Sequence, residues 1–392
     1  MNTLIKWPGG KKNEIKYIKN LIPQFDNYVE PFFGGGALFF ELEPKNAYIN
    51  DYSTDLIQFY QILSEKKSRK ILKKRLMEYN KYWDSFTVIM EQTSNELLQI
   101  YYNFKNNKIE SDELKNQIIT FVTLNNNLFW SNYPEDKVFF KEVFEKELIK
   151  NLFSKIKRTK KIDLKNNFSK NEVLKNIETA LRSAFYMHER HIMNQIALKK
   201  MEVSKEENTA NYYFVREYCY GSMFRYNKKG EFNIPYGGIS YNTKNFKNKI
   251  DLLFSEDTKH ILKDTIIENL DFEQFLNKYE FTEKDFIFFD PPYDTDFSSY
   301  AKNNFTLEDQ KRLAECIINL KAKFILIIKN TNFIYDLYKN KEGIYIETFE
   351  KKYSYNVKGR NERKVEHLII HNIKRKENNI KKDKQSKFDN LF

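Results

Sequence analysis

At residues 286–293 the chain reads Phe286-Ile287-Phe288-Phe289-Asp290-Pro291-Pro292-Tyr293, an apolar run that ends at an acid followed by two prolines. The apolar run has the length and the aromatic and β-branched content of a buried strand. In open α/β sheets, ligands bind where such strands end. Because the two prolines lack backbone N–H groups, the Asp290 carboxylate and the Pro291 carbonyl can project into a cleft as paired acceptors.

Such a pair of acceptors suits an exocyclic amino group, which offers two N–H donors. The aromatic ring of Tyr293 could stack on the flat face of the same nucleobase. The alternative interpretation of these residues is a rigid turn after a strand. Evidence from elsewhere in the chain decides between the two.

Composition restricts the class of protein. With 392 residues, one large or two modest domains are expected. The net charge of +12 favours a polyanionic partner, although the excess of Lys, Asn, Phe and Tyr could also reflect an AT-rich genome. Only Cys219 and Cys316 are present, so neither disulfides nor a metal site is expected. The chain has no signal-peptide pattern and no apolar stretch of about 18 residues, which predicts a soluble, cytoplasmic protein.

Two glycine loops lie in the N-terminal third. The first, Lys6-Trp7-Pro8-Gly9-Gly10-Lys11, precedes a helical pattern that extends to about Leu21, and an ordinary turn before a helix is its alternative interpretation. The second, Gly34-Gly35-Gly36, follows a short strand and opens a helix. Glycines in these loops let a ligand approach the bare backbone, and five of the chain's 11 glycines fall here.

An acid follows the next expected strand, Ala47-Tyr48-Ile49-Asn50. Asp51 at its end is placed to accept hydrogen bonds from ribose hydroxyls, and helix N-capping by Asp51 or Ser53 is the compatible alternative. A nicotinamide-binding protein could share this pattern. It has no general need of Asp290 and its prolines.

These segments, in this order, resemble the Dam-like α-group of DNA adenine-N6 methyltransferases. The family patterns Lys-Trp-x-Gly-Gly-Lys and Glu-Pro-Phe-x-Gly-x-Gly match Lys6–Lys11 and Glu30–Gly36, and Asp-Pro-Pro-Tyr follows late in the chain. Arg225–Gly237 is similar to the family's segment in its DNA-binding region. One departure is Tyr220-Gly221, where the best-known members have Tyr-Asn, which puts the target sequence in doubt.

The resemblance implies an α/β, Rossmann-like, S-adenosylmethionine-dependent methyltransferase that uses no metal. It also implies functional residues of three kinds. The catalytic residues are Asp290, Pro291, Pro292 and Tyr293; the cofactor-binding residues are Trp7, Lys11, Phe32, Gly34, Gly36, Asp51, Asp271, Phe272 and Asp290; the DNA-binding residues are Lys6, Tyr220, Arg225 and Asn227.

The middle of the chain is expected to be helical, because it has no glycine between Gly36 and Gly221 and Pro134 is its single proline between Pro44 and Pro235. We interpret residues 66–244 as a helical target-recognition domain. Residues 1–65 and 245–373 form the catalytic domain, whose mostly parallel sheet ends in an antiparallel hairpin of residues 344–349 and 365–371. Residues 374–392 are expected to form a basic, disordered tail.

The predicted function is site-specific transfer of a methyl group from S-adenosylmethionine to N6 of an adenine flipped out of double-stranded DNA. Two alternatives remain: cytosine-N4 methylation, and a catalytically idle DNA-binding regulator of the same fold. A cognate restriction endonuclease is a possible partner. The protein is expected to be a monomer or weak dimer, associated with the nucleoid.

Overall fold

A computed structural model describes residues 1–8, 10, 14–134, 139–293, 305–352 and 364–374. Its strands form one seven-stranded sheet in the order β3-β2-β1-β4-β5-β7-β6. The first five strands in the chain run parallel, and β7 lies antiparallel between β5 and β6. The strands are β1 Tyr28–Glu30, β2 Ala47–Asn50, β3 Thr265–Glu268, β4 Phe286–Phe289, β5 Lys323–Lys329, β6 Tyr345–Lys352 and β7 Lys364–His371. The expected α/β fold with a terminal antiparallel hairpin is confirmed.

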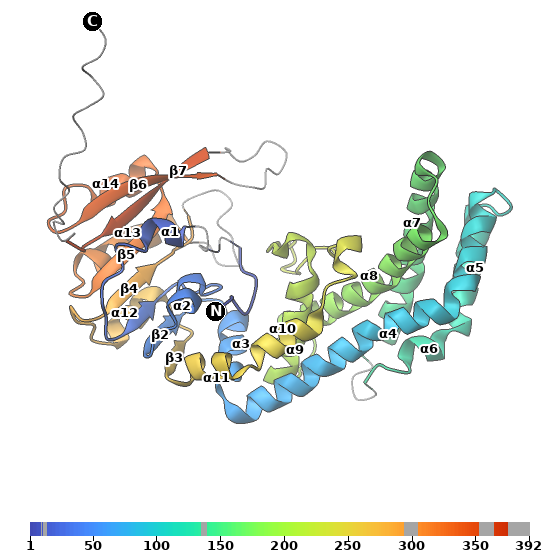
Figure 1. Ribbon diagram of the computed structural model, residues 1–392, viewed down its shortest axis with the longest axis horizontal. Coiled ribbons are helices and arrows are strands. Elements are labelled where there is room, and N and C mark those ends of the chain that lie inside the picture. The colour runs from blue at the N-terminus through green and yellow to red at the C-terminus, as the bar shows by residue number, and fades with distance from the viewer. Residues whose placement is uncertain (9, 11–13, 135–138, 294–304, 353–363, 375–392) are drawn as a thin grey trace, which may run out of the picture.

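Strand β4 is apolar throughout because both of its faces are covered. Phe286 and Phe288 belong to a core shared with the N-terminal helices, whereas Ile287 and Phe289 point into a second core beneath the C-terminal helices. Helices therefore cover both faces of the sheet (Figure 1). The helices of this part are α1 Ile15–Ile18, α2 Ala37–Leu42, α3 Thr54–Ser64, α10 Phe246–Leu253, α11 Glu256–Lys263, α12 Phe272–Lys278, α13 Leu307–Ile318 and α14 Asn332–Tyr338.

Helix α1 is shorter than its sequence pattern predicts. The helix was expected to reach about Leu21 but ends at Ile18, although Ile15, Ile18 and Leu21 are all buried as expected. Pro23 disfavours the helical conformation only at Ile22 and so does not account for the end at Ile18, after which the Leu21 N–H bonds to the Ile18 carbonyl in a tighter turn. The three-residue spacing of Thr306 and Asp309 predicts a capping box at the start of α13, and the structure contains it: Thr306 accepts from the Asp309 backbone, and Asp309 accepts from the Thr306 backbone.

The middle of the chain forms a helical arm, which we define as residues 66–218. The 40-residue helix α4 runs along the arm, and the other helices pack beside it (Figure 1). Within the part that the structure describes, no helix of this arm or of the sheet domain is long and apolar enough to cross a membrane. The helices of the arm are α4 Lys66–Lys105, α5 Ser111–Leu124, α6 Asn126–Trp130, α7 Lys141–Asn166, α8 Lys170–Ala197 and α9 Lys205–Tyr218.

Candidate active site

A cavity of about 490 Å³ lies at the carboxyl edge of the parallel strands. The segments that follow β1, β2, β3 and β4 all contribute to its wall, since the ends of parallel strands meet at one edge of a sheet. Every predicted catalytic residue and every predicted cofactor residue except Lys11 lines this cavity. Lys11 lies outside the described residues. The lining residues predicted from sequence are Trp7, Phe32, Gly34, Gly36, Asp51, Asp271, Phe272, Asp290, Pro291, Pro292 and Tyr293.

The glycine loop between β1 and α2 is packed against Trp7. Gly34 has φ +50°, and a Cβ atom there would lie 2.8 Å from Trp7 Cδ1. The loop therefore needs glycine for two reasons: its left-handed backbone conformation and the close approach of the indole. The glycines are predicted to let a ligand approach the bare backbone; all three line the cavity, and Trp7, which also lines it, packs against one side of the loop.

Asp51 joins the ends of two strands. Its Oδ2 atom accepts a hydrogen bond from the Gly34 N–H at 2.8 Å, and its Oδ1 atom accepts from the Ser53 N–H at 2.9 Å. Burial raises the pKa of Asp51 to about 6, even though these two hydrogen bonds lower it. Ser53, the alternative cap, makes no side-chain capping bond to α3.

Glu30 is a buried acid in the cavity wall that sequence reasoning did not single out. It is 2% exposed, and the Tyr28 hydroxyl donates to it at 2.8 Å. Burial raises the pKa of Glu30 well above its ordinary value, and the nearby charges of Asp290 and Asp51 raise it further. The raised pKa favours the neutral form of Glu30, but among the described residues the other acids of the wall still outnumber the bases, which favours a cationic ligand: Asp51, Asp271, Asp290 and Asp309 against Arg312.

The loop after β4 places Asp290 at the cavity and is tethered from α13. The side-chain amide of Gln310, itself 1% exposed, donates to the Pro292 carbonyl at 2.9 Å. The ring of Tyr293 meets the buried His367 ring edge to face, with centroids 5.4 Å apart. The carboxylate and the aromatic ring expected to handle a base thus come from one fixed loop.

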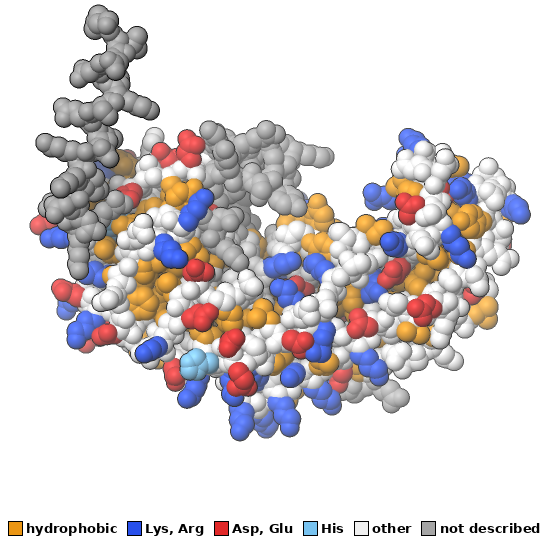
Figure 2. Space-filling model, viewed as in Figure 1, with side chains coloured by type: hydrophobic (Ala, Val, Ile, Leu, Met, Phe, Trp, Pro, Cys, Tyr) orange, Lys and Arg blue, Asp and Glu red, His pale blue; other side chains and the backbone are white. Residues whose placement is uncertain are grey.

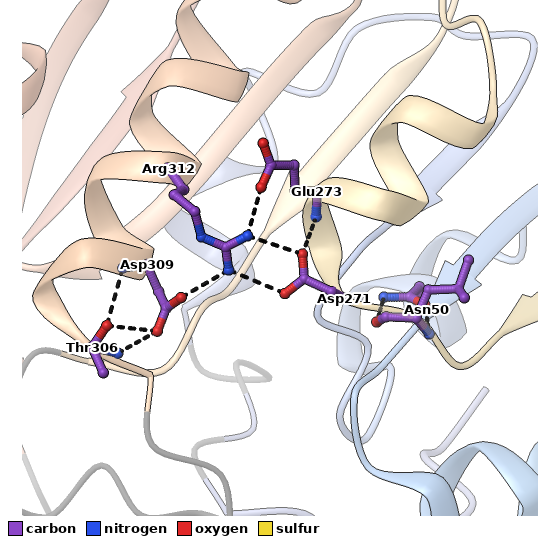
Figure 3. Close-up of polar contacts among 7 residues, drawn as sticks. Asn50, Asp271, Glu273, Thr306, Asp309 and Arg312 are labelled. Atoms are coloured by element: carbon purple, nitrogen blue, oxygen red, sulfur yellow. Dashed lines mark hydrogen bonds and ion pairs between the residues drawn. The ribbon is translucent and has the colours of Figure 1, made fainter.

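Opposite this loop, Asp271 forms the N-cap of α12 and is bound by Arg312 of α13 (Figure 3). Arg312 reaches three carboxylates, those of Asp271, Glu273 and Asp309. Phe272 packs against Phe32 and Phe305 at centroid distances of 5.4 and 5.7 Å, which makes an aromatic floor beside Asp271. A flat heterocycle with an amino group fits such a floor and acid.

Asn50 and Arg312 were both missed from sequence. The Asn50 side chain donates to the carbonyls of Pro31 and Leu270 at 3.0 and 3.1 Å and accepts from the Leu270 N–H at 2.9 Å, so it ties together three strand ends. The position of Asn50 at a predicted strand end was a usable signal. Arg312 offered none, because Asp271 and Glu273 are distant from it in sequence and its i,i+3 spacing from Asp309 is typical of any exposed helix pair.

Comparisons with known proteins agree with this geometry. Residues 7–178 and 135–352 match the family model of the D12 class N6 adenine-specific DNA methyltransferases. The chain belongs to this D12-class family. It is therefore a DNA adenine methyltransferase of the Dam-like group, and the expectation of an adenine-N6 enzyme is confirmed.

Two of the relatives cover most of this D12-class chain, and a third covers about a third of it. Type II methyltransferase M.CviBI of Paramecium bursaria Chlorella virus NC1A is 25% identical over 379 residues, which span 95% of this chain and 100% of that protein. Type II methyltransferase M.MjaIII of Methanocaldococcus jannaschii is 25% identical over 91% of this chain and 93% of its own length. The DNA adenine methylase of Haemophilus influenzae is 29% identical over 34% of this chain and 46% of its own.

The predicted DNA-binding residues of the methyltransferase lie beside the cavity, where the chain leaves the arm. Tyr220 is 46% exposed on a short 3-10 turn, Tyr220–Ser222, and Lys6 and Arg225 are also exposed. Trp7 of the cavity packs on Phe224, with ring centroids 4.6 Å apart. The side chain of Asn227 is used within its own turn, where it donates to Glu231 and accepts from two backbone N–H groups.

Proposed function

We propose that S-adenosylmethionine is the methyl donor and binds in this cavity. Three features of the cavity support this: its volume, its acidic wall, which suits a molecule with a sulfonium and an ammonium group, and its aromatic floor at Phe32, Phe272 and Phe305. The adenine end of the cofactor would lie on this floor with its amino group toward Asp271. Its ribose would face Asp51, and Trp7 would close the side nearest the glycine loop.

The chemistry requires a methyl carbon and the N6 atom of adenine to meet in line. When bound, S-adenosylmethionine supplies an electrophilic methyl group on sulfur. The Asp290 carboxylate and the Pro291 carbonyl accept the two N6 hydrogens, which makes the nitrogen more sp3-like and aims its lone pair at the donor. As the bond between N6 and the methyl carbon forms, the bond between that carbon and sulfur would break, with the thioether S-adenosylhomocysteine as leaving group; one N6 proton is then lost, and Asp290 is placed to accept it. Tyr293 stacks on the extruded base, as flipped bases require.

The observation that carries this proposal is that Asp290 and its prolines share one cavity with the glycine loop, Asp51 and Asp271. The test is the Asp290→Ala variant, compared with Asp257→Ala, which removes an exposed carboxylate of α11. We expect Asp290→Ala to lose at least about a hundredfold in tritiated-methyl transfer while DNA binding is largely kept. Turnover equal to that of the Asp257→Ala control would defeat the assignment. Nucleoside analysis of the product would give the modified base.

Double-stranded DNA is the substrate, and we infer that the enzyme acts at a specific sequence. Full-length similarity to proteins named Type II methyltransferases supports this, as does the net charge of +12. The face shown in Figure 2 is hollowed between the sheet and the far end of the helical arm, and lysine and arginine side chains border the hollow. The duplex would lie there, with Tyr220 beside the cavity. Single-molecule sequencing of DNA from a host that expresses the enzyme would give the recognition sequence; unmodified DNA would contradict the proposal.

A restriction endonuclease of the same specificity is a proposed partner, on the strength of the same relatives. Protection of host DNA by the methyltransferase against that nuclease is the expected result. Methylation at a sequence that protects against no such nuclease would instead assign the enzyme to a solitary role.

A further inference from the structure

The first turns of helix α13 touch both sides of the active-site cavity. Asp309 and Arg312 line the cavity, and Gln310 lies buried between them and the loop after β4. The capping box fixes where the helix begins: Asp309 Oδ2 accepts from the Thr306 N–H at 2.7 Å and from its hydroxyl at 2.8 Å. Side chains on this turn therefore project from a rigid base.

Arg312 reaches from this turn to the proposed adenine subsite. Its Nη2 atom lies 3.2 Å from Asp271 Oδ2 and 2.8 Å from Asp309 Oδ1, and its Nη1 atom lies 2.5 Å from Glu273 (Figure 3). Its guanidinium carbon also lies 4.8 Å from the centroid of the Phe272 ring. The planar guanidinium fork fixes the Asp271 carboxylate in one orientation, which a lysine could not do.

Gln310 reaches in the other direction, to the catalytic loop. Its amide donates to the Pro292 carbonyl at 2.9 Å, and it is 1% exposed. Because the prolines have no backbone N–H groups, their backbone can be tethered only through its carbonyls, and the Gln310 amide supplies the donor to one of them. Gln310 is two residues from Arg312 in sequence, yet the two side chains act on opposite sides of the cavity.

We propose that Arg312 and Gln310 are positioning residues, one for the methyl donor and one for the methyl acceptor, so that α13 sets the distance between the two. This inference rests on the proposed cofactor site. In-line transfer tolerates little error, since a displacement of about 1 Å at the reacting atoms can cost about a hundredfold in rate. A single rigid turn that holds both partners meets this requirement.

The proposal predicts that two neighbouring substitutions separate binding from turnover. Arg312→Gln weakens binding of S-adenosylhomocysteine about tenfold, which is the loss of about one charge-assisted hydrogen bond, and lowers kcat much less. Gln310→Ala leaves that affinity unchanged and lowers kcat between about tenfold and a hundredfold. Lys311→Gln, on the exposed side of the same turn, is the matched control. Calorimetry gives the affinities, and steady-state methylation gives kcat.

A second ligand isolates the role of Asp271. The 6-deaminated analogue of S-adenosylhomocysteine, whose base is unsubstituted purine, has a hydrogen atom in place of the amino group, so it offers Asp271 no donor at that position. Arg312→Gln should therefore weaken binding of S-adenosylhomocysteine but change the affinity for the 6-deaminated analogue by less than about twofold, a difference that general destabilisation would not produce. Both ligands are uncharged at sulfur, so a change in the electrostatic field of the cavity affects them alike.

The outcomes are distinct. Equal weakening of both ligands by Arg312→Gln, or the same change in affinity and kcat for both variants, would overturn the positioning roles. Failure of the unsubstituted enzyme to bind S-adenosylhomocysteine would instead overturn the proposed cofactor site. Melting temperatures of the three variants, measured alongside, show that each is folded.

Discussion

Asp51 is the cavity residue whose protonation bears most directly on ligand binding. Its carboxylate accepts from the Gly34 and Ser53 backbone, and burial nonetheless raises its pKa to about 6. The folded protein thus holds a proton that the unfolded chain releases near pH 3.8, the ordinary value. The free energy of unfolding contributed by Asp51 is therefore lost as the pH rises through about 6.

A cationic ligand reverses that preference, because it binds the ionised carboxylate better. We expect affinity for S-adenosylmethionine to fall by up to about tenfold per pH unit below pH 6 and to level off above pH 7. Calorimetry between pH 5 and pH 8 measures this. In Asp51→Asn, affinity should be weaker and independent of pH. A pH dependence that survives this substitution would assign the titration to Glu30 and contradict the prediction.

At the scale of elements, the loop between β1 and α2 is sensitive to the addition of a single methyl group at Gly34. Gly34→Ala should lower the free energy of unfolding by about 2 kcal/mol, because its φ of +50° is unfavourable for alanine and its Cβ would press on Trp7. Displacing Trp7 should also weaken S-adenosylmethionine binding about tenfold. Denaturant unfolding and calorimetry give the two quantities.

Gly343→Ala is the control for that substitution. Gly343 has φ +74°, and a Cβ atom there would meet nothing within 4 Å. It lies in the turn before β6, outside the cavity lining. This variant should lose about 1 kcal/mol of stability and keep its cofactor affinity. If the two variants bind cofactor equally well, Trp7 does not shape the site.

The elements that are determined by residues close together in the chain were predictable from sequence. The run Phe286–Phe289 gave β4, Thr306 with Asp309 gave the start of α13, and the lack of glycine gave the helical arm. The catalytic loop and the glycine loop were recognisable from sequence because proline restricts the backbone conformations that a segment can adopt and glycine extends them. Their meeting in one cavity followed from the parallel order of the strands.

What sequence could not supply are the side-chain pairs that join elements. Arg312 contacts Asp271 across 41 positions, and Asn50 contacts Leu270 across 220. Neither spacing has a periodic signature, since such pairs form only when tertiary packing brings the elements together. Asn227 was assigned to DNA binding by resemblance. In the structure its side chain forms hydrogen bonds within its own turn, and its contact with DNA stays a prediction.

At the scale of the molecule, the sheet and the helical arm meet at Arg216, near the end of α9. Arg216 is 1% exposed and donates to the carbonyls of Ser222 and Met223 at 2.9 Å and of Lys6 at 3.3 Å. Its guanidinium also lies 3.6 Å from the centroid of the Phe224 ring. One buried side chain thus holds the N-terminal segment that carries Lys6 and Trp7 against the turn that carries Tyr220.

We expect Arg216→Met to weaken DNA binding about thirtyfold, because the turn must then be ordered at a cost of about 2 kcal/mol when DNA binds. Arg216 is buried and would contact no phosphate. The plot of log Kd against log salt concentration for Arg216→Met should therefore be displaced from that of the unsubstituted enzyme, with its slope unchanged. Lys6→Ala or Arg225→Ala should instead reduce its slope by about 1. Arg69→Met, which removes donors from the first turn of α4 to the Leu63 and Ser255 carbonyls, controls for lost stability. Equal effects of Arg69→Met and Arg216→Met, or a slope change in Arg216→Met, would show that Arg216 does not position the DNA-binding turn.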